Sequence, residues 1–427
     1  MSDRPPFWEP WAGTATLPAA LLLGEHVTHA LFERTGSMFA LWLPGVGRSV
    51  MVRDPAVVRE LLLAPEEAVD DVAANLVQTP VIGPQGLAVL APEANRALRR
   101  LMTPALRPQS RERLRAEAES LARDVLAGCP LKVPFALGPR LRTATMGATL
   151  AQVTGVAEAA RAAEWNRVLH RMFQQAVSAE ITVRYMLRGA GGLAWWPSFR
   201  RHMGECDALV YGEIARRRRC GDDRDDVLGA LMRARDERGA RLTDRVLRDQ
   251  VMSLFAGART TTATGLAWLF ERVARHPDVL RRVAEGDEAY ADAVCYEALR
   301  VRPPVAFFGR ALRRPVELGG RTVRPGTAVI VHIRALHHHP GLYPDPAAFR
   351  PERWLGRRPG GYGWMPFGGG RRTCVGDRMA LALMAAFLRV FAESVTIAPG
   401  VPGDEAVRWL AISNVPGDDC RLVLTPR

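Results

Sequence analysis

The residues of this chain best suited to chemistry lie in a glycine-rich stretch at positions 367–376, which reads FGGGRRTCVG. Three glycines precede a single cysteine, Cys374, and an apolar helical pattern begins immediately after it. Glycine lets the backbone adopt conformations closed to other residues and approach a flat partner closely. Backbone N–H groups and the positive end of a helix dipole stabilise a thiolate. A thiolate on such a turn is suited to be one axial ligand of a haem iron, where it favours O–O cleavage.

The alternative for Cys374 is a free structural cysteine beside an ordinary loop, because lone buried cysteines are common. The spacing F-x-x-G-x-R-x-C-x-G, however, is filled by Phe367, Gly370, Arg372, Cys374 and Gly376. This pattern resembles the haem-binding loop of the cytochrome P450 superfamily, the haem-thiolate monooxygenases. The resemblance implies haem b (iron protoporphyrin IX) as cofactor, with Cys374 as the metal ligand. It also implies haem contacts from Phe367, Gly368, Arg372 and Gly376.

Composition sets limits on the class of protein. The 427 residues carry a net charge of +13 and are 48% hydrophobic, which is typical of a globular protein with a sizeable core. The basic residues are almost all arginine, with Lys132 the only lysine, and they occur in every segment. No nucleic-acid motif or aromatic–basic interleaving accompanies them. We therefore expect no nucleic-acid partner, and a charge that solvates helices and attracts an acidic partner.

The six cysteines have neither paired nor metal-type spacing, which favours free thiols in a reducing compartment. The longest apolar stretch near the N-terminus, residues 17–23, is too short to span a bilayer and lacks the pattern of a signal peptide. We therefore expect a soluble, cytoplasmic protein without a membrane partner.

The secondary-structure pattern is mainly helical with small β regions. Residues 38–43 and 49–52, separated by a Pro-Gly turn, predict a hairpin. Asp54 then predicts the cap of a short helix that begins at Pro55. Residues 66–90 are irregular but keep apolar side chains, which indicates a functional loop.

The second half of the chain contains its longest helical pattern, residues 242–275, which should cross the whole domain. Before it, the run of four arginines at 216–219 predicts a solvated helix end. After residue 300 the pattern changes to short strands and turns, with a turn predicted at 414–417 that leads into a last strand. We found no internal repeat and no low-complexity linker, so we predict one domain over residues 1–427.

Glu297 and Arg300 lie three residues apart on one helix face. A lone E-x-x-R is usually a solvated surface pair. Here it lies about 70 residues before the cysteine loop, and a proline pair follows it. It resembles the E-x-x-R core pair of the P450 superfamily, whose third member would be Arg353. The resemblance implies a structural role for these three residues.

The two propionates of a haem favour arginine partners. By the resemblance, the donors are Arg372 in the cysteine loop, Arg310 after the proline pair, and Arg99 on an early helix. The family usually has His or Trp four residues before the last of these arginines. This chain has Asn95, an amide that can still donate a hydrogen bond.

The long helix should cross the distal face of the haem, where the family usually carries A-G-x-[Asp/Glu]-Thr. The resemblance implies a kink, an oxygen groove at Gly257 and Ala258, and a proton relay. Aligned on the Ala-Gly pair, Arg259 replaces the acid and Thr260 is the threonine. Aligned on the helix end, the threonine is Thr261, which we prefer because an inserted residue would rotate every later side chain by about 100°. In both alignments the acid is missing.

The role of Arg259 has two alternatives, since a guanidinium stays protonated and cannot replace a proton-donating acid. We favour an ion pair outside the reaction centre, and the second alternative is an anchor for an anionic substrate group. Peroxide-using members of the superfamily carry such an anchoring arginine, but they lose the threonine. The expected pocket wall includes Val81, Arg259, Val305, Phe307 and Ile412.

The resemblance covers nearly the whole chain and implies the helical P450 prism with a small β region. The leading function is hydroxylation or epoxidation of a small, largely apolar molecule by O₂, with electrons from a separate ferredoxin and reductase and a possible place in natural-product biosynthesis. The missing acid motivates two alternatives: oxidative coupling or rearrangement without oxygen insertion, and peroxide-driven oxidation. A non-catalytic haem or ligand-binding protein is the alternative from another class.

Overall fold

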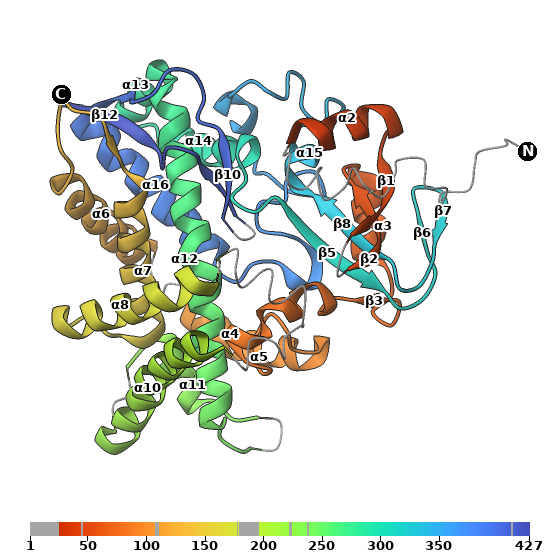
Figure 1. The fold of residues 1–427 in the computed structure, drawn as a ribbon. Helices are drawn as coiled ribbons and strands as arrows, with labels where there is room; N and C mark the ends of the chain where they lie inside the picture. Colours follow the sequence, from red (N-terminus) through yellow and green to blue (C-terminus); the bar gives the residue numbers. More distant parts are fainter. Residues whose placement is uncertain are drawn as a thin grey trace, which may run out of the picture. The chain divides into compact units, whose positions relative to one another are not determined.

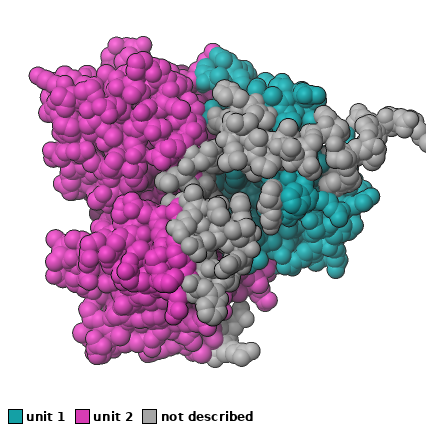
Figure 2. All heavy atoms as spheres, viewed as in Figure 1, with its two compact units in different colours: residues 1–76, 305–348, 359–373 teal, residues 77–304, 349–358, 374–427 magenta. Residues whose placement is uncertain are grey.

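The computed structural model describes residues 25–43, 46–106, 111–176, 178, 196–221, 224–236, 239–410 and 413–427. The chain forms two compact units, which Figure 2 colours separately. Unit 1 takes residues 1–76, 305–348 and 359–373, and unit 2 takes residues 77–304, 349–358 and 374–427. The division falls between Thr373 and Cys374, inside the glycine-rich stretch. One domain over residues 1–427 stays a prediction.

Unit 1 is built on a five-stranded sheet in the order β1-β2-β8-β5-β3. The pairs are antiparallel except β2 with β8, which is parallel. A separate two-stranded sheet joins β6 and β7. The strands of the unit are β1 (Met38–Leu43), β2 (Gly47–Val52), β3 (Val69–Asp70), β5 (Phe307–Leu312), β6 (Val316–Leu318), β7 (Arg321–Val323) and β8 (Ala328–His332).

The helices of unit 1 are short and pack on this sheet, as Figure 1 shows for α2 and α3. Their bounds are α2 (Glu25–Thr35), α3 (Pro55–Leu63), the 3-10 helix η1 (Ala73–Gln78, whose last two residues belong to unit 2), α15 (Ile333–His337) and the 3-10 helix η3 (Gly370–Arg372). Asp54 caps α3 by accepting the Ala56 N–H (2.8 Å). The predicted hairpin and the predicted helix after Asp54 are therefore confirmed.

Unit 2 contains most of the helices. They are α4 (Thr79–Ile82), α5 (Pro92–Leu106), α6 (Arg111–Ala127), α7 (Gly138–Thr154), α8 (Ala159–Ala176), α10 (Pro197–Cys220), α11 (Val227–Arg233), α12 (Asp244–Ala274), α13 (Pro277–Ala284), α14 (Glu288–Val301), the 3-10 helix η2 (Pro351–Trp354) and α16 (Asp377–Ser394). The predominantly helical fold with small sheets is confirmed.

The helix α12 organises unit 2. It begins after Thr243, whose side chain accepts the Val246 N–H, and runs without interruption to Ala274. Figure 1 shows it passing through the unit, with α7 and α8 beside its middle and α10 and α11 near its N-terminal end. The long helix predicted over 242–275 is confirmed. Its C-terminal half is buried, and Phe270 packs on Phe391 of α16 with ring centroids 4.6 Å apart.

Small sheets complete unit 2. β12 (Arg421–Pro426) lies between β4 (Phe135–Ala136) and β9 (Val395–Pro399), and β10 (Val407–Leu410) pairs with β11 (Ser413–Pro416). The turn predicted at 414–417 is therefore wrong for residues 414–416, because they pair with β10, and the turn into β12 begins at Gly417. The segment 66–90 is likewise more ordered than predicted, since it holds β3, η1 and α4.

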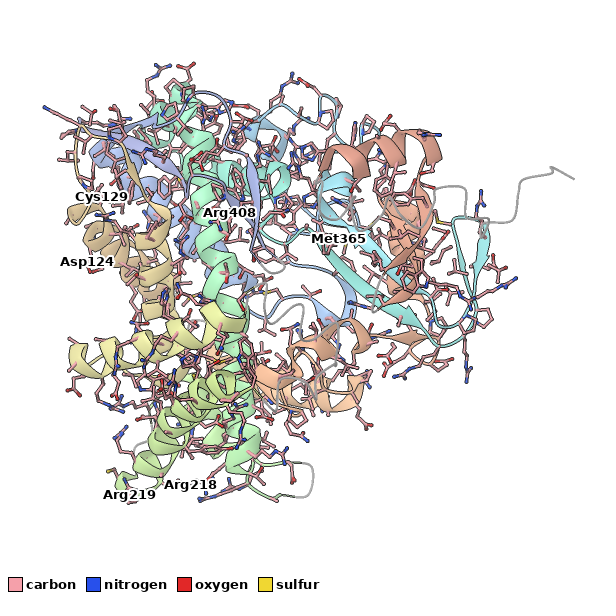
Figure 3. The ribbon with its side chains drawn as sticks, viewed as in Figure 1. Asp124, Cys129, Arg218, Arg219, Met365 and Arg408 are labelled. Atoms are coloured by element: carbon pink, nitrogen blue, oxygen red, sulfur yellow. The ribbon has the colours of Figure 1, made fainter. Side chains whose placement is uncertain are left out.

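The structure corrects the prediction that the arginine run at the end of α10 is a solvated helix end. Arg218 and Arg219, labelled in Figure 3, belong to the last turn of α10. Arg217, however, is 1% exposed and pairs with Glu213 (2.8 Å) and Asp226 (2.6 Å). A solvated helix end is therefore wrong for Arg217, because its position faces two buried carboxylates.

Within the described ranges, no helix is both long enough and apolar enough to cross a membrane.

Candidate functional site

Cys374 lies in unit 2, at the start of α16, with an accessible side chain. Its Sγ accepts the backbone N–H of Gly376 at 3.3 Å, and Gly376 is the N-cap residue of the helix. Desolvation raises the pKa of the Cys374 thiol, whereas the Gly376 N–H and the charge of Arg99 lower it. The Sγ atom therefore accepts a hydrogen bond, but the protein groups around it do not lower the pKa of the thiol overall. Binding to a metal ion would deprotonate it.

The preceding part of the stretch lies in unit 1 and depends on its glycines. Gly368 and Gly370 both have φ of +66°, a region that side chains with a Cβ rarely adopt. At Gly369 an added Cβ would lie 2.0 Å from the Met365 methyl. Phe367 packs edge-on against Trp364, with ring centroids 6.0 Å apart. The backbone conformation that the glycines were predicted to allow is thus present.

Unit 1 also gathers arginines around one buried carboxylate, Asp71, which is 3% exposed. Arg310 donates its Nε to Asp71 at 2.7 Å, and Arg371 donates its Nε to the other carboxylate oxygen at 3.1 Å. Arg310 also donates to the carbonyls of Gly309 (2.8 Å) and Gly369 (3.4 Å). Arg310 is thus held in place by a partner that the sequence did not identify.

Arg372 is half-buried in the same unit. Burial lowers the pKa of Arg372, as does the charge of Arg371, whereas Asp71, Asp70 and Glu66 raise it. Three guanidinium groups, of Arg310, Arg371 and Arg372, face the carboxylate of Asp71 and the more distant one of Glu66, 4.0 Å from Arg371, which leaves a positive balance. This cluster has the charge needed to bind an anion such as a carboxylate of a cofactor.

On α5 in unit 2, Asn95 and Arg99 are joined by a hydrogen bond. Arg99 donates its Nε to Asn95 Oδ1 at 2.9 Å, and Asn95 donates its Nδ2 to the carbonyl of Leu87 at 2.6 Å. Asn95 is 2% exposed, and Arg99 is half-buried. The predicted pair therefore exists, but both ends of the amide are occupied by protein groups.

Glu297, Arg300 and Arg353 come together in unit 2. Arg300 donates to both oxygens of Glu297 (2.8 and 2.7 Å), and Arg353 donates to one of them (3.3 Å). The Trp354 indole (2.9 Å) and the Arg350 N–H (2.9 Å) also donate to Glu297. Glu297 and Arg300 are 0% exposed. The predicted brace is present, and Trp354 is a member that the prediction missed although it follows Arg353 directly.

The middle of α12 presents small and hydroxylated residues. Thr261 donates its hydroxyl to the carbonyl of Gly257 at 2.7 Å, a bond that bends helices slightly. Thr260 is half-buried and makes no side-chain hydrogen bond to any residue that the structure describes. Ala258 is half-buried, and a Cβ added at Gly257 would meet nothing within 4 Å. Space thus lies beside α12 at the positions expected for the oxygen groove.

Arg259 is half-buried and differs from the buried arginines of unit 2. Its guanidinium lies over the ring of Phe173 on α8, 5.2 Å from the centroid. Burial, together with the charge of Arg142, lowers the pKa of Arg259 to about 10. In the described part of the chain no acidic side chain pairs with it. The ion pair that we favoured for Arg259 is therefore not found among these residues.

The remaining pocket predictions fall in different parts of the chain. Val81 of unit 2 packs against the apolar cluster that includes Phe173 and Phe255. Val305 and Phe307 are half-buried residues of unit 1. Ile412 lies outside the described residues. Their roles as pocket residues stay predictions.

Sequence reasoning missed Asp71, which no motif marks. The one local signal is the acidic pair Asp70-Asp71 beside apolar residues in a segment treated as a loop. Asp70 pairs with Arg313 at 2.9 Å, so each member of the pair holds an arginine of the later strand region.

The side chains present fit an iron porphyrin. The donor set contains an accessible sulfur that accepts an N–H, which suits an axial thiolate. Glycines with positive φ lead to it, and an arginine-rich cluster of unit 1 suits carboxylates.

Comparisons with known proteins agree with this chemistry. The family model described as "Cytochrome P450" matches residues 20–394. Cytochrome P450 135B1 of Mycobacterium tuberculosis is 33% identical over 96% of this chain and 89% of its own length. Cytochrome P450 137 of the same organism is 35% identical over 87% of this chain and 79% of its own length.

Solved structures share the fold. The retinoic acid-bound cyanobacterial CYP120A1 has a TM-score of 0.81 and 22% identity, covering 93% of this chain and 94% of its own. The haem domain of cytochrome P450DA also has a TM-score of 0.81, with 20% identity, covering 98% of this chain and 96% of its own. The fold predicted from the cysteine loop and the order of helices is therefore confirmed.

Proposed function

Because this chain belongs to the cytochrome P450 family, we propose that it hydroxylates or epoxidises a small, largely apolar organic molecule with O₂. Family membership makes it a monooxygenase with a haem cofactor, which takes a small-molecule substrate, O₂ and electrons from a redox partner. The non-catalytic alternative is thereby set aside. One observation carries the site assignment: Cys374 Sγ is accessible and accepts the Gly376 N–H.

Three finer points belong to this proposal. The electron donor is a separate ferredoxin with its reductase, and the net charge of +13 would favour such an acidic partner. The protein works in the cytoplasm, in keeping with its six free cysteines. Its place is in natural-product biosynthesis, where oxidation of apolar molecules by a dedicated enzyme is a common need.

The bound haem supplies O₂ activation, and residues of this chain supply its binding and the protons. Cys374 would ligate the iron, and Arg99, Arg310 and Arg372 would bind the propionates. Arg310 is oriented for this by Asp71, which fixes one edge of its guanidinium. Thr261, with Thr260 beside it, would hold a water that relays protons during the reaction. Bound water or the substrate takes the place of the missing acid.

Incorporation of labelled oxygen tests the reaction type. Under the proposal, one atom of ¹⁸O₂ appears in the product and the other in water. Product formed without the label would instead support oxidative coupling or rearrangement, which the missing acid also motivates.

A second candidate function, peroxide-driven oxidation of a carboxylate-bearing substrate, is favoured by Arg259. Its cation is desolvated and has no acidic partner in the described residues, so a substrate carboxylate would complete it. Both threonines are retained, which favours the O₂-dependent reaction. Turnover with hydrogen peroxide alone, at a rate matching turnover with O₂ and reductant, would support the second candidate.

A further inference from the structure

Asn95 forms a bridge within unit 2. It is almost fully buried, and its amide is used at both ends: Nδ2 donates to Leu87 O (2.6 Å) and Oδ1 accepts from Arg99 Nε (2.9 Å). Only a group that donates and accepts at once can make both bonds while uncharged. An aspartate at this position would lose the first bond, and a leucine would lose both.

The segment 81–87, on the Leu87 side of the bridge, is held at its other end by α12. Asp249 Oδ2 accepts the Gln85 N–H at 3.0 Å, and Gln250 Nε2 donates to the Gln85 carbonyl. Gly83, at φ +79°, passes so close to α12 that an added Cβ would lie 2.1 Å from Asp249 Oδ1. The segment can therefore move only when these partly buried hydrogen bonds change.

Arg248 strengthens the same attachment. It is 6% exposed and donates to Asp207 of α10 (2.7 Å), to Asp249 (2.9 Å) and to the carbonyl of Val81 (3.4 Å). A row of neighbouring residues on α12 thus holds the segment that begins at Val81, a predicted pocket residue.

Arg99, at the far end of the bridge, is a proposed partner of a haem propionate, so its charge would lie beside the haem. The Nε bond to Asn95 restricts where that charge can lie. A displacement of Arg99 would change the potential at the haem iron, because interaction energy depends on distance in a poorly screened interior.

We propose that Asn95 is a positioning residue that couples the segment 81–87 to Arg99, so that the position of this segment sets the charge felt at the haem. Movement of the segment, as when a substrate displaces Val81, pulls on Leu87 and is passed by the buried amide to the guanidinium. The inference rests on the proposed role of Arg99 beside the haem. It does not depend on the substrate or the electron donor.

The reduction potential of the haem in the purified holoenzyme tests the coupling. A cation near the iron favours the reduced state, so Arg99→Leu lowers the potential and sets the full size of the effect. Asn95→Leu should lower it by most of that amount. Thr103→Val is the matched control on α5, since it removes a hydroxyl bond to the Arg99 carbonyl (2.6 Å) without touching Asn95. It should leave the potential unchanged.

A double-mutant cycle separates coupling from a merely structural role. Gln250→Leu releases the segment from α12, far from Arg99 in sequence. It should lower the potential in the otherwise unchanged protein and have no further effect in Asn95→Leu. Hydrogen exchange of residues 81–87 should rise with Gln250→Leu in both backgrounds, which shows that the perturbation reaches the segment.

Asn95→Asp provides a second background if the leucine variant does not fold. It keeps an acceptor for Arg99 but cannot donate to Leu87, so Gln250→Leu should again have no further effect on the potential. An equal drop with Gln250→Leu in all backgrounds would overturn the proposal, as would faster exchange without any drop. An unchanged potential in Arg99→Leu would overturn it too, and would remove Arg99 from the haem site while leaving the monooxygenase function intact.

Discussion

Glu297 and Arg259 are both charged residues on helices of unit 2, and their surroundings are opposite. Glu297 accepts five hydrogen bonds, from Arg300 twice and from Arg350, Arg353 and Trp354 once each. Arg259 lies over one aromatic ring and has no acidic partner in the described residues. A buried charge whose hydrogen-bonding groups are all paired braces the fold, whereas a half-buried charge without an acidic partner is available to a ligand.

Cys374, like Arg259, has a side chain that is available to a ligand, and its replacement gives the largest expected effect. Cys374→Ser should abolish thiolate ligation and turnover, because an alcohol is a far weaker iron donor than a thiolate. The reduced carbon monoxide complex checks this: the far-red-shifted Soret band of thiolate ligation should disappear. Cys220→Ser, at an exposed cysteine, is the control and should keep the band. A retained band in Cys374→Ser would show that the ligand is assigned wrongly.

Glu297→Gln tests the fully paired charge in this comparison. It leaves Arg300 buried without a counter-charge, which should lower the free energy of unfolding by about 3–5 kcal/mol. Denaturant unfolding measures this loss. Glu352→Gln is the matched control, because Glu352 is a carboxylate with a 54% exposed side chain and should lose at most about 1 kcal/mol. Equal losses in both variants would contradict a structural role specific to Glu297.

His332 extends the comparison to a buried side chain whose surroundings suit only its uncharged form. It is buried, and its Nδ1 accepts the Ala335 N–H at 3.1 Å. Burial lowers the pKa of His332 to about 4. Since the unfolded state binds the proton first, the free energy of unfolding should fall between pH 6.5 and pH 4, by about 3 kcal/mol in total. Denaturant unfolding at pH 7 and pH 5 checks this, and His332→Asn should remove that part of the pH dependence.

Arg259→Leu tests the charge that has no acidic partner in the described residues. If Arg259 anchors an anionic group, carboxylate ligands should bind more weakly by about 1.5–3 kcal/mol, while matched amides should bind as before. Optical titration of acid and amide pairs against both proteins measures the difference. Stability should not fall, because a desolvated cation without an acidic partner is removed. Equal affinity changes for acid and amide would leave Arg259 with a structural role only.

The threonines of α12 give the smallest expected effect. Thr261→Ala should release more reducing equivalents as peroxide, so product per reductant consumed should fall several-fold. Thr260→Ala should cost less under the alignment that we prefer. The ratio of product to reductant in the two variants decides the matter, and a larger loss at Thr260 would favour the other alignment.

The sequence alone predicted those features that depend on neighbouring residues. Spacing identified the cysteine loop, and the positive φ at Gly368 and Gly370 confirms why glycine is needed there. The apolar period predicted α12 to within two residues at its start. Such features were accessible because helix period, capping and turn conformation are local properties of the chain.

Only the tertiary structure decided which charged side chains have partners for their hydrogen-bonding groups. Arg371 and Asp71 are 300 residues apart in sequence, and Glu297 and Trp354 are 57 apart. The run at 216–219 was expected to be solvated, yet Arg217 is buried between two carboxylates. The partners of a charged side chain are set by how distant segments pack, so composition and spacing did not distinguish Glu297, fully paired, from Arg259, which has no acidic partner in the described residues.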